Sequence, residues 1–425
     1  MTAKHIYIVG IGGIGLSALA QLLKHRGIEV SGSDRSASPT TELLESQGIT
    51  VFIGHDAAHL PENTELLIYS DAVPAFSPER ARASDLKIPQ KSYFEALGGI
   101  ANEKKVIAVS GAHGKTTTTA MIIDILEDAG LDPTAVVGSL RSKTKTNFRS
   151  GEGEYFIVEA DEYLRHFHNF NPTILVITNV DEDHLDYYRD LADIQSAFIL
   201  LAQKVPKGGF IICNPNDQKV APVIKHVEGT VVDYMSYLSI NIELKVLPFN
   251  RVNAAAALGA AVAAGVAEMA ARRSLTEFAG TWRRFEYKGK TRNGALLYDD
   301  YGHHPTEIEA TLSSIKVEFP GKRLIVAFHP HLYSRTKKLF DEFVTAFDAA
   351  DRIFIAPIFA AREPMDPSIS SEMLAEALRA RGKDATAVSS LEEVTREALV
   401  AGEGDIFLTM GAGDIYKAGE KALEG

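Results

Sequence analysis

The sequence predicts an α/β protein with three domains, each built around a largely parallel β-sheet. Three observations support this prediction. The 425 residues exceed what one ordinary core accommodates; strand-like apolar runs alternate with helical patterns along the chain; and two strands run into glycine-rich turns. We expect an N-terminal Rossmann-like domain at 1–101, a central P-loop ATPase-type domain at 102–290 and a C-terminal Rossmann-like α/β domain at 291–425.

Composition and charge are typical of a soluble globular protein, with 45% hydrophobic and 24% charged residues. The net charge of −12 argues against a nucleic-acid partner, and we expect the one short cationic run, residues 141–145, to be a solvated loop. The single cysteine, Cys213, favours a reducing, cytoplasmic location. We expect no membrane insertion, because no apolar run approaches the roughly 20 residues that a membrane helix needs.

The first domain opens with a glycine pattern that predicts diphosphate binding. An apolar strand at 6–9 precedes the loop, a helix at 16–25 follows it, and Asp34 stands at the end of a second strand. The loop residues are Gly10, Gly12, Gly13, Ile14 and Gly15. Glycines let the backbone approach a diphosphate at a helix N-terminus, and a dinucleotide or a UDP-sugar would satisfy this pattern equally. We expect further strands at 50–53 and 66–69, and a linker at 98–105.

The second domain begins with a P-loop of unusual spacing. A strand at 106–109 runs into the loop, and Val109 stands where the usual P-loop has its first glycine. The loop and helix start comprise Gly111, Ala112, His113, Gly114, Lys115, Thr116 and Thr117. Backbone N–H groups and a helix N-terminus predict phosphate binding here. Lys115 would reach the terminal phosphates, and the Thr116 hydroxyl would hold Mg²⁺.

Acidic and polar residues follow the next two strands of this domain. Glu159, Asp161 and Glu162 end the strand at 155–158, and Thr178 to His184 end the strand at 174–178. Beside a bound triphosphate, Glu159 is the expected second Mg²⁺ ligand, and His184 could complete a second metal site. The simpler alternative is a solvated acidic loop, with Asp181 or Asp183 capping a helix. The last helix of the domain is expected at 250–268.

The third domain places histidines and an arginine after two predicted strands. The residues are Asp299, Asp300, Tyr301, His303 and His304 after the first strand, and His329, His331, Ser334 and Arg335 after the second. Zinc is disfavoured, because the spacings match no common zinc pattern and no cysteine accompanies them. Binding of a carboxylate-bearing substrate, with Arg335 as the anion clamp, fits better.

In order along the chain, these motifs resemble those of the Mur ligases, the ATP-dependent amide-forming ligases of peptidoglycan precursor synthesis. The matching stretches are 10–17, 111–118, 159–162, 178–186, 250–254, 283–285, 299–307, 330–336, 357–363 and 411–415. The resemblance implies ATP-dependent joining of L-alanine to the lactyl carboxylate of UDP-N-acetylmuramate through an acyl phosphate. It also implies ATP and Mg²⁺ as cofactors, a cytoplasmic location, and a monomer or homodimer.

The resemblance implies a role for each motif. ATP would be bound by residues 111–117, with Asn250 at the adenine and Arg284 at the phosphates. Thr116 and Glu159 would hold one Mg²⁺, and His184 would serve a second. The UDP-sugar would lie on residues 10–15 with Asp34, Ser70 and Tyr301. Lys115, His184, His303, His331 and Arg335 would be the catalytic set. Either His303 or His331 could take the amine proton, and the sequence does not choose between them.

The chain also departs from the family pattern. Leu332 replaces an arginine, Phe249 replaces a histidine, and Asp71 replaces a second serine. No lysine lies between His184 and Lys204, so no carbamylated lysine is expected, and the stretch 218–247 is short. Four alternatives stay open: a recycling ligase that adds a whole peptide, a folate-type polyglutamate ligase, a nicotinamide oxidoreductase, and a UDP-sugar-binding scaffold with impaired catalysis.

Overall fold

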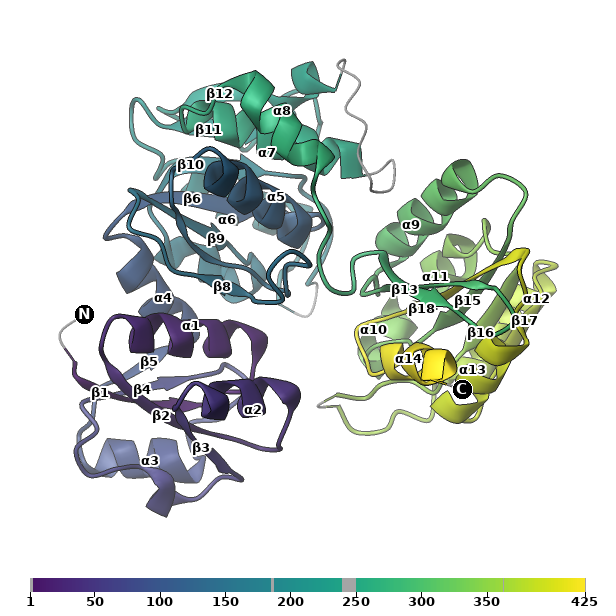
Figure 1. The fold of residues 1–425 in the computed structure, drawn as a ribbon, viewed down its shortest axis with the longest axis horizontal. Helices are drawn as coiled ribbons and strands as arrows, with labels where there is room; N and C mark the ends of the chain where they lie inside the picture. Colours follow the sequence, from purple (N-terminus) through teal and green to yellow (C-terminus); the bar gives the residue numbers. More distant parts are fainter. Residues whose placement is uncertain (1–2, 185–186, 239–249, 362, 425) are drawn as a thin grey trace. The chain divides into compact units, whose positions relative to one another are not determined.

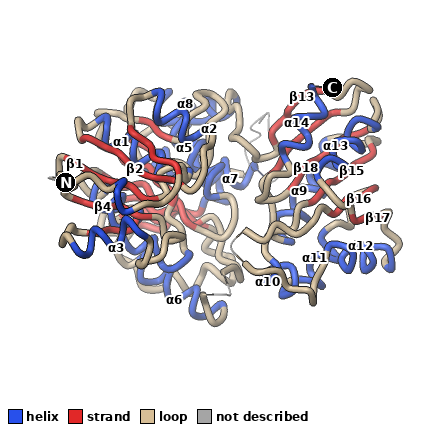
Figure 2. Tube along the Cα trace, turned by 90° about the horizontal axis from the view of Figure 1, so that it is seen from below, coloured by secondary structure: helices blue, strands red, loops and turns tan. Residues whose placement is uncertain are grey.

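The computed structural model describes residues 3–184, 187–238, 250–361 and 363–424. The chain forms two compact units: the first comprises the described residues up to 238 and 251–279 and contains two β-sheets, and the second comprises Asn250 and the described residues from 280 onward and contains one. In both units strands are flanked by helices (Figure 2), which confirms the predicted α/β class. No helix in the described part of the chain is long and apolar enough to cross a membrane.

The first sheet has five parallel strands in the order β3-β2-β1-β4-β5 (Figure 1). Its strands are β1 (His5–Val9), β2 (Glu29–Asp34), β3 (Thr50–Ile53), β4 (Leu66–Tyr69) and β5 (Gln90–Ser92). Its helices are α1 (Ile14–His25), α2 (Pro39–Ser46), η1 (Ala57–His59), α3 (Pro78–Asp85) and α4 (Tyr93–Ala101). The strand order reverses between β1 and β4, which is where open α/β sheets bind ligands.

Alternating apolar residues of β1 cover both faces of this sheet. Ile6 and Ile8 belong to the core that includes Leu19 of α1, whereas Tyr7 and Val9 pack in the cluster that contains Ala83 of α3. Figure 1 shows α1 and α3 on opposite faces accordingly. A strand buried on both faces reads as a continuous apolar run, which is why the sequence predicts it well.

The second sheet has seven strands in the order β12-β11-β10-β6-β9-β7-β8, parallel except for the β7–β8 pair. Its strands are β6 (Lys105–Ser110), β7 (Thr134–Val136), β8 (Phe148–Arg149), β9 (Tyr155–Glu159), β10 (Pro172–Ile177), β11 (Phe210–Cys213) and β12 (Thr230–Asp233). Its helices are α5 (Lys115–Asp128), η2 (Tyr163–Asn169), α6 (Leu191–Ala202), η3 (Tyr234–Tyr237), α7 (Asn250–Ala263) and α8 (Glu268–Thr276). The P-loop strand β6 lies at the centre, between β10 and β9.

Two expectations for local structure are wrong. Half of the expected linker at 98–105 is helix, because α4 continues to Ala101, and β6 begins at Lys105. Gly98 lets α4 pack closely, since a Cβ there would lie 2.5 Å from the Asn169 carbonyl oxygen. The helix expected at 250–268 divides into α7 and α8 around Gly265, whose φ of +93° favours glycine.

The cationic run at 141–145 is only partly the solvated loop that we expected. The Arg141 side chain is 4% exposed, and its guanidinium lies 2.7 Å from an Asp124 oxygen and 2.8 Å from a Glu127 oxygen, both on α5. Lys143, which is 42% exposed, pairs with Asp128. Hydropathy alone misplaces Arg141, because a buried cation is tolerated only where carboxylates meet it.

The third sheet has six strands in the order β13-β14-β18-β15-β16-β17, with β13 antiparallel. Its strands are β13 (Glu286–Lys290), β14 (Leu296–Asp300), β15 (Arg323–Phe328), β16 (Arg352–Ile355), β17 (Ala385–Ala387) and β18 (Asp405–Met410). Its helices are α9 (Pro305–Glu318), α10 (Tyr333–Lys338), α11 (Phe340–Ala346), α12 (Ser371–Ala380), α13 (Leu391–Val400) and α14 (Tyr416–Glu424). Because β13 pairs with β14, this sheet starts before the boundary expected at 290/291.

Candidate active site

The P-loop connects the central strand β6 to α5, and two of its positions admit only glycine. Gly111 has φ +134°, and a Cβ there would lie 2.1 Å from Thr178 Oγ1. Gly114 has φ +83°, and a Cβ there would lie 2.3 Å from Asn253 Oδ1 of α7. The loop therefore lies tightly against the end of β10 and against α7, with the N-terminus of α5 presented to a ligand.

Two residues after β10 fasten the middle of the loop. The carbonyl oxygen of His113 accepts hydrogen bonds from Thr178 Oγ1 at 2.6 Å and from Asn179 Nδ2 at 3.0 Å. The Asn179 side-chain oxygen accepts from the His113 backbone N–H at 2.9 Å. These bonds hold the loop in one conformation before any nucleotide binds, which lowers the entropic cost of binding.

Lys115 forms a close ion pair with Glu162. Its Nζ lies 2.9 Å from both Glu162 carboxylate oxygens and 2.6 Å from the Gly111 carbonyl oxygen. Glu162 is 3% exposed. Burial alone lowers the pKa of Lys115, but the negative charges of Glu162 and Asp161 outweigh burial and raise that pKa above its ordinary value. Lys115 is therefore an ammonium group at neutral pH.

Thr116 and Glu159 lie together where two neighbouring strands end. Thr116 Oγ1 donates to Glu159 Oε2 at 3.0 Å, and Glu159 Oε1 accepts from the Gly138 N–H at 2.5 Å. A hydroxyl and a carboxylate beside the phosphate-binding loop are the oxygen ligands that Mg²⁺ prefers. The donor set therefore fits the expected first metal site.

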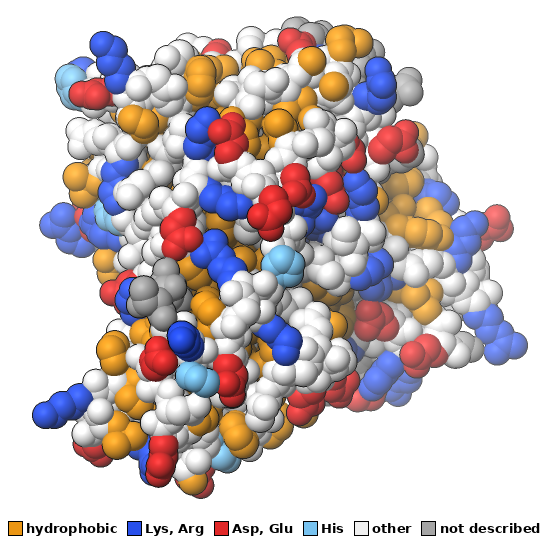
Figure 3. All heavy atoms as spheres, turned by 60° about the vertical axis from the view of Figure 1, so that its left-hand side comes forward, with side chains coloured by type: hydrophobic (Ala, Val, Ile, Leu, Met, Phe, Trp, Pro, Cys, Tyr) orange, Lys and Arg blue, Asp and Glu red, His pale blue; other side chains and the backbone are white. Residues whose placement is uncertain are grey.

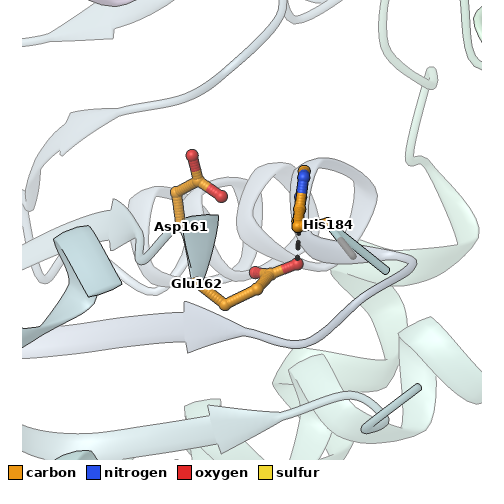
Figure 4. Close-up of side chains that lie close together, drawn as sticks. All are labelled: Asp161, Glu162 and His184. Carbon is orange, nitrogen blue, oxygen red and sulfur yellow. Dashed lines mark ion pairs between the residues drawn. The ribbon is translucent and has the colours of Figure 1, made fainter. Parts of the chain in front are cut away.

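A second group of donors surrounds His184. Its Nε2 lies 3.8 Å from Glu162 Oε1, and one ligand atom each from Asp161, Glu162 and His184 falls within 4.8 Å of the others. In Figure 4 the Glu162 carboxylate faces the His184 ring, with Asp161 beside them. Carboxylates and an imidazole fit a divalent cation, although here Glu162 is shared with the Lys115 ammonium group.

The glycine loop of the first sheet is held by its own acidic residue. Asp34 Oδ2 accepts from the Gly12 N–H at 2.8 Å, and Ser33 O accepts from the Gly10 N–H at 2.7 Å. Gly13 precedes α1, whose first turn starts with Ile14 and Gly15. Asp34 thus orders the loop itself, in addition to any contact with a ligand. Ser70 follows β4, where its hydroxyl accepts from the Ala72 N–H at 3.3 Å.

Asp71, one of the departures from the family pattern, has a specific partner. Its Oδ2 lies 3.1 Å from His166 Nε2, while His166 Nδ1 lies 3.9 Å from Asp161 Oδ2. The His166 ring stacks on Phe94 with centroids 4.1 Å apart. Burial lowers the pKa of His166, but the nearby carboxylates of Asp161 and Asp71 outweigh burial and raise the pKa to about 9. Asp71 thus ties the first sheet to the carboxylates that follow β9.

In the second unit, a buried ion pair supports the end of β14. Arg283 Nε lies 2.7 Å from Asp299 Oδ2, and its other nitrogens donate to the carbonyl oxygens of Gly413 and Gly411 at 3.0 and 2.5 Å. Asp300 accepts from the Gly302 N–H at 2.7 Å. This network fixes the backbone that leads from β14 into the histidine-bearing loop.

The structure brings Tyr301, His303 and His331 together in this unit. His303 Nδ1 lies 3.1 Å from the Tyr301 carbonyl oxygen, and the rings of His303 and His331 are 5.8 Å apart. The His331 ring also stacks on Phe359. The Arg284 guanidinium lies 5.2 Å from the Tyr301 ring centre, so Arg284 belongs to this unit rather than to the end of the central domain.

Leu332, a further departure, occupies a strained backbone position. Its φ is +68°, which is uncommon for a residue with a branched side chain. Its carbonyl oxygen accepts from Thr336 Oγ1 at 2.8 Å, and its N–H donates to the Phe359 carbonyl oxygen at 2.9 Å. Leu332 thereby caps α10, the helix that carries Arg335.

The predicted site residues thus fall into two groups that the two units carry separately. The first unit gathers residues 111–117 with Glu159 and His184, and the second gathers Arg284, Tyr301, His303 and His331. The second unit also carries Arg335, on α10. Asn250 begins α7 and is buried, and Phe249 lies outside the described residues. Sequence reasoning gave no role to Glu162, Asn179 or Asn253. The available signal was that each of them falls in a stretch that resembles the family motifs. For Glu162 there was a second signal, because a buried lysine needs a counter-charge.

The face drawn in Figure 3 carries basic and acidic side chains interspersed, without one sign prevailing.

Three family models match along the chain: "Mur ligase family, catalytic domain" at 5–105, "Mur ligase middle domain" at 109–245 and "Mur ligase, glutamate ligase domain" at 283–413. The chain belongs to the Mur ligase family.

Comparison with full-length relatives shows which enzymes of the family the chain resembles. The UDP-N-acetylmuramate–L-alanine ligase of Clostridium kluyveri is 38% identical over 450 residues, covering 99% of this chain and 98% of that protein. The enzyme of that name from Caldicellulosiruptor saccharolyticus is 39% identical over 448 residues, covering 98% of each. The crystal structure of UDP-N-acetylmuramate–alanine ligase from Thermotoga maritima matches with a TM-score of 0.83 and 27% identity over 99% of this chain and 98% of that chain. A murein peptide ligase from Psychrobacter arcticus shares the fold, with a TM-score of 0.72 and 24% identity over 99% of this chain and 98% of that chain.

Proposed function

We propose that this chain is a UDP-N-acetylmuramate–L-alanine ligase (EC 6.3.2.8) that uses ATP to join L-alanine to the lactyl carboxylate of UDP-N-acetylmuramate in peptidoglycan precursor synthesis. The observation that carries the proposal is the likeness to proteins of that name over nearly the full length, at 38–39% identity. The geometry of the P-loop and of the carboxylates beside it supports the same reaction class.

The reaction needs an activated acid, because a carboxylate does not react with an amine at neutral pH. The lactyl carboxylate attacks the γ-phosphorus of ATP, which forms an acyl phosphate and releases ADP. The amine of alanine then attacks the acyl carbon, an amide bond forms, and inorganic phosphate leaves. Catalysis of the first step rests on positioning and on neutralising charge around the transferred phosphoryl group.

Lys115 is the main cation for that first step. It already carries a positive charge and lies beside the loop, so ATP phosphates can replace Glu162 as its partner. Backbone N–H groups of residues 111–117 bind the phosphates at the start of α5. We assign Asn250 to the adenine, Arg284 to the phosphates, and residues 10–15 with Asp34 and Ser70 to the UDP part of the sugar nucleotide.

Thr116 and Glu159 would hold the first Mg²⁺, and His184 with Asp161 and Glu162 would hold a second. A divalent cation supplies additional positive charge at the phosphoryl oxygens. Thr116 and Glu159 contribute by keeping two oxygen ligands together beside the loop, 3.0 Å apart. The Gly138 N–H orients the Glu159 carboxylate through its second oxygen.

We propose that His303 takes the proton from the attacking amine of alanine. Its Nδ1 lies 3.1 Å from the Tyr301 carbonyl oxygen, which favours the tautomer with the proton on Nδ1 and the lone pair on Nε2. His331 and Tyr301 flank this imidazole, and Arg335 would pair with the carboxylate of alanine or of the muramyl group.

The remaining assignments are part of the same proposal. The protein acts in the cytoplasm as a monomer or homodimer. The first domain covers 1–101 and binds the UDP-sugar, and the second begins at 102 and binds ATP. The third binds the amino acid, and the pairing of β13 with β14 favours a start before residue 291.

A substitution of Lys115 tests the proposal. Wild-type protein should release ADP with UDP-N-acetylmuramate plus L-alanine, and release far less when the L-alanine is replaced by the peptide that a recycling ligase would add. Lys115→Ala should lower ADP release about 100-fold or more, while calorimetry still detects UDP-N-acetylmuramate binding. Unchanged turnover in Lys115→Ala, or a preference for the peptide, would refute this assignment.

A further inference from the structure

Tyr93 lies against the glycine loop of the first sheet. It begins α4 directly after β5, at the sheet edge where the strands end. A Cβ added to Gly15 would lie 2.7 Å from Tyr93 Cζ and 2.8 Å from its hydroxyl oxygen. The tyrosine ring therefore covers the first turn of α1, beside the expected diphosphate, and only glycine at position 15 leaves room for it.

Helix α4, which begins at Tyr93, also lies near the carboxylates that we expect to bind metal. Helix α4 contacts α1, β9 and η2, so its N-terminus lies between the glycine loop and the residues that follow β9. Burial, together with the negative charges of Glu159 and Asp161, raises the pKa of Tyr93 above its ordinary value. The hydroxyl thus stays protonated and able to donate a hydrogen bond.

Aromatic rings continue from Tyr93 toward His184. Tyr93 and Phe94 meet edge to face with centroids 4.7 Å apart, and Phe94 stacks on His166 at 4.1 Å. Tyr163 lies 6.3 Å from His166 and 4.8 Å from His184. This row of rings connects the glycine loop with the second donor group, all within the first unit.

A sugar nucleotide must bridge the same interval, if the proposed function holds. Its diphosphate lies at the start of α1, its carboxylate reaches the P-loop near Lys115 and Glu159, and the amino sugar lies between them. Apolar walls with a few placed polar groups are how proteins select such ligands. Within the described residues the Tyr93 hydroxyl makes no hydrogen bond. A ligand can therefore accept a hydrogen bond from this hydroxyl without breaking an existing one.

We propose that Tyr93 determines specificity for the amino-sugar part of the substrate, its hydroxyl donating a hydrogen bond to the sugar and its ring supporting the sugar's face. This inference rests on the proposed function and adds a residue that the glycine pattern does not contain. The diphosphate itself would be bound by backbone N–H groups at the start of α1, after Gly13, so Tyr93 distinguishes UDP-N-acetylmuramate from UDP.

Calorimetry with two probes tests the inference. UDP-N-acetylmuramate and UDP are titrated separately into wild type, Tyr93→Phe and, as a matched control, Tyr287→Phe, a half-exposed tyrosine of β13. Tyr93→Phe should raise the Kd for UDP-N-acetylmuramate about 2- to 10-fold, the size of one lost neutral hydrogen bond, and leave the Kd for UDP unchanged. In steady state the KM for UDP-N-acetylmuramate should rise, while kcat and the KM for ATP stay constant.

The outcomes separate this inference from the proposed function. An unchanged Kd for UDP-N-acetylmuramate in Tyr93→Phe, or an equal loss for UDP, overturns the role of Tyr93 even if wild type releases ADP normally. If wild type binds UDP-N-acetylmuramate but releases no ADP, the proposed function is overturned. The role of Tyr93 is then decided by the Kd for UDP-N-acetylmuramate in wild type and in Tyr93→Phe. Wild type that binds no UDP-N-acetylmuramate overturns both.

Discussion

Lys115 and Glu162 show how one pair of residues serves both folding and chemistry. The ammonium group needs a partner in a site that is nearly closed to water, and the 3% exposed Glu162 supplies it. Under the proposed function, ATP phosphates would take the place of the carboxylate beside Lys115, so the ammonium group would be paired with a negative charge in both states. The pair keeps the lysine beside the loop in the nucleotide-free protein.

Removing only one partner of this pair should destabilise the protein. Lys115→Ala leaves Glu162 without its ammonium partner, and we expect a loss of about 3–5 kcal/mol in the free energy of unfolding. Adding Glu162→Gln to Lys115→Ala should recover most of that loss while ADP release stays abolished. Urea unfolding of the two single variants and the double variant measures this coupling; additive effects would show that the two side chains do not interact.

His329 gives the second unit a pH-dependent stability. It is buried, and burial lowers its pKa to about 4, below the ordinary value near 6.5. The unfolded chain therefore binds more protons between these values, so this residue's contribution is present above pH 6.5 and is lost as the pH falls from about 6.5 to about 4. The loss should reach about 3 kcal/mol.

His329→Gln removes this titration, so the free energy of unfolding should fall less steeply between pH 6.5 and 4 than in wild type. The exposed residue His226 offers a control, and His226→Gln should keep the wild-type slope. Urea unfolding across this pH range provides the measurement. Equal slopes for His329→Gln and wild type would contradict the account.

At the scale of elements, the segment between β7 and β8 anchors α5. Arg141 of this segment reaches two carboxylates on α5, and burial raises the pKa of Asp124 to about 6 in spite of the guanidinium. The same segment begins at Gly138, whose N–H orients Glu159. Asn147 ends it by donating to the Ile14 carbonyl oxygen at the start of α1. One segment thus contacts both α1 and α5.

Arg141→Met should therefore destabilise the first unit strongly. Asp124 would lose its counter-charge in a buried position, at a cost of about 3–5 kcal/mol. Arg396→Met, on the exposed side of α13, should change the free energy of unfolding by no more than about 0.5 kcal/mol. Chemical denaturation compares the two variants, and a similar small effect in both would argue against an anchoring role.

The elements themselves were largely predictable from the sequence. Strands such as β1 and β6 are buried on both faces, so their apolar runs are unambiguous, and glycine loops mark where helices α1 and α5 begin. The C-terminal part of α4 was missed, because Gly98 and Gly99 suggest a linker when the packing of Gly98 on Asn169 is unknown. Arg141 was misplaced for a related reason, since its partners Asp124 and Glu127 lie 17 and 14 residues earlier, on α5.

At the scale of the molecule, motif order predicted the class of protein and the sheet edges that carry the site. Parallel strands end at a common edge, so polar residues after strands converge there without knowledge of the packing. Partners such as Lys115 with Glu162, or Asp71 with His166, depend on rotamers and on the contact between two domains. Sequence spacing does not encode these, and the structure was needed to find them.

The proposed function depends on activation of the lactyl carboxylate as an acyl phosphate. We would label that carboxylate of UDP-N-acetylmuramate with oxygen-18 and incubate it with wild-type protein, ATP, Mg²⁺ and L-alanine. Mass spectrometry should find one labelled oxygen in the inorganic phosphate for each amide bond formed. Amide formation with no label in the phosphate would contradict the account.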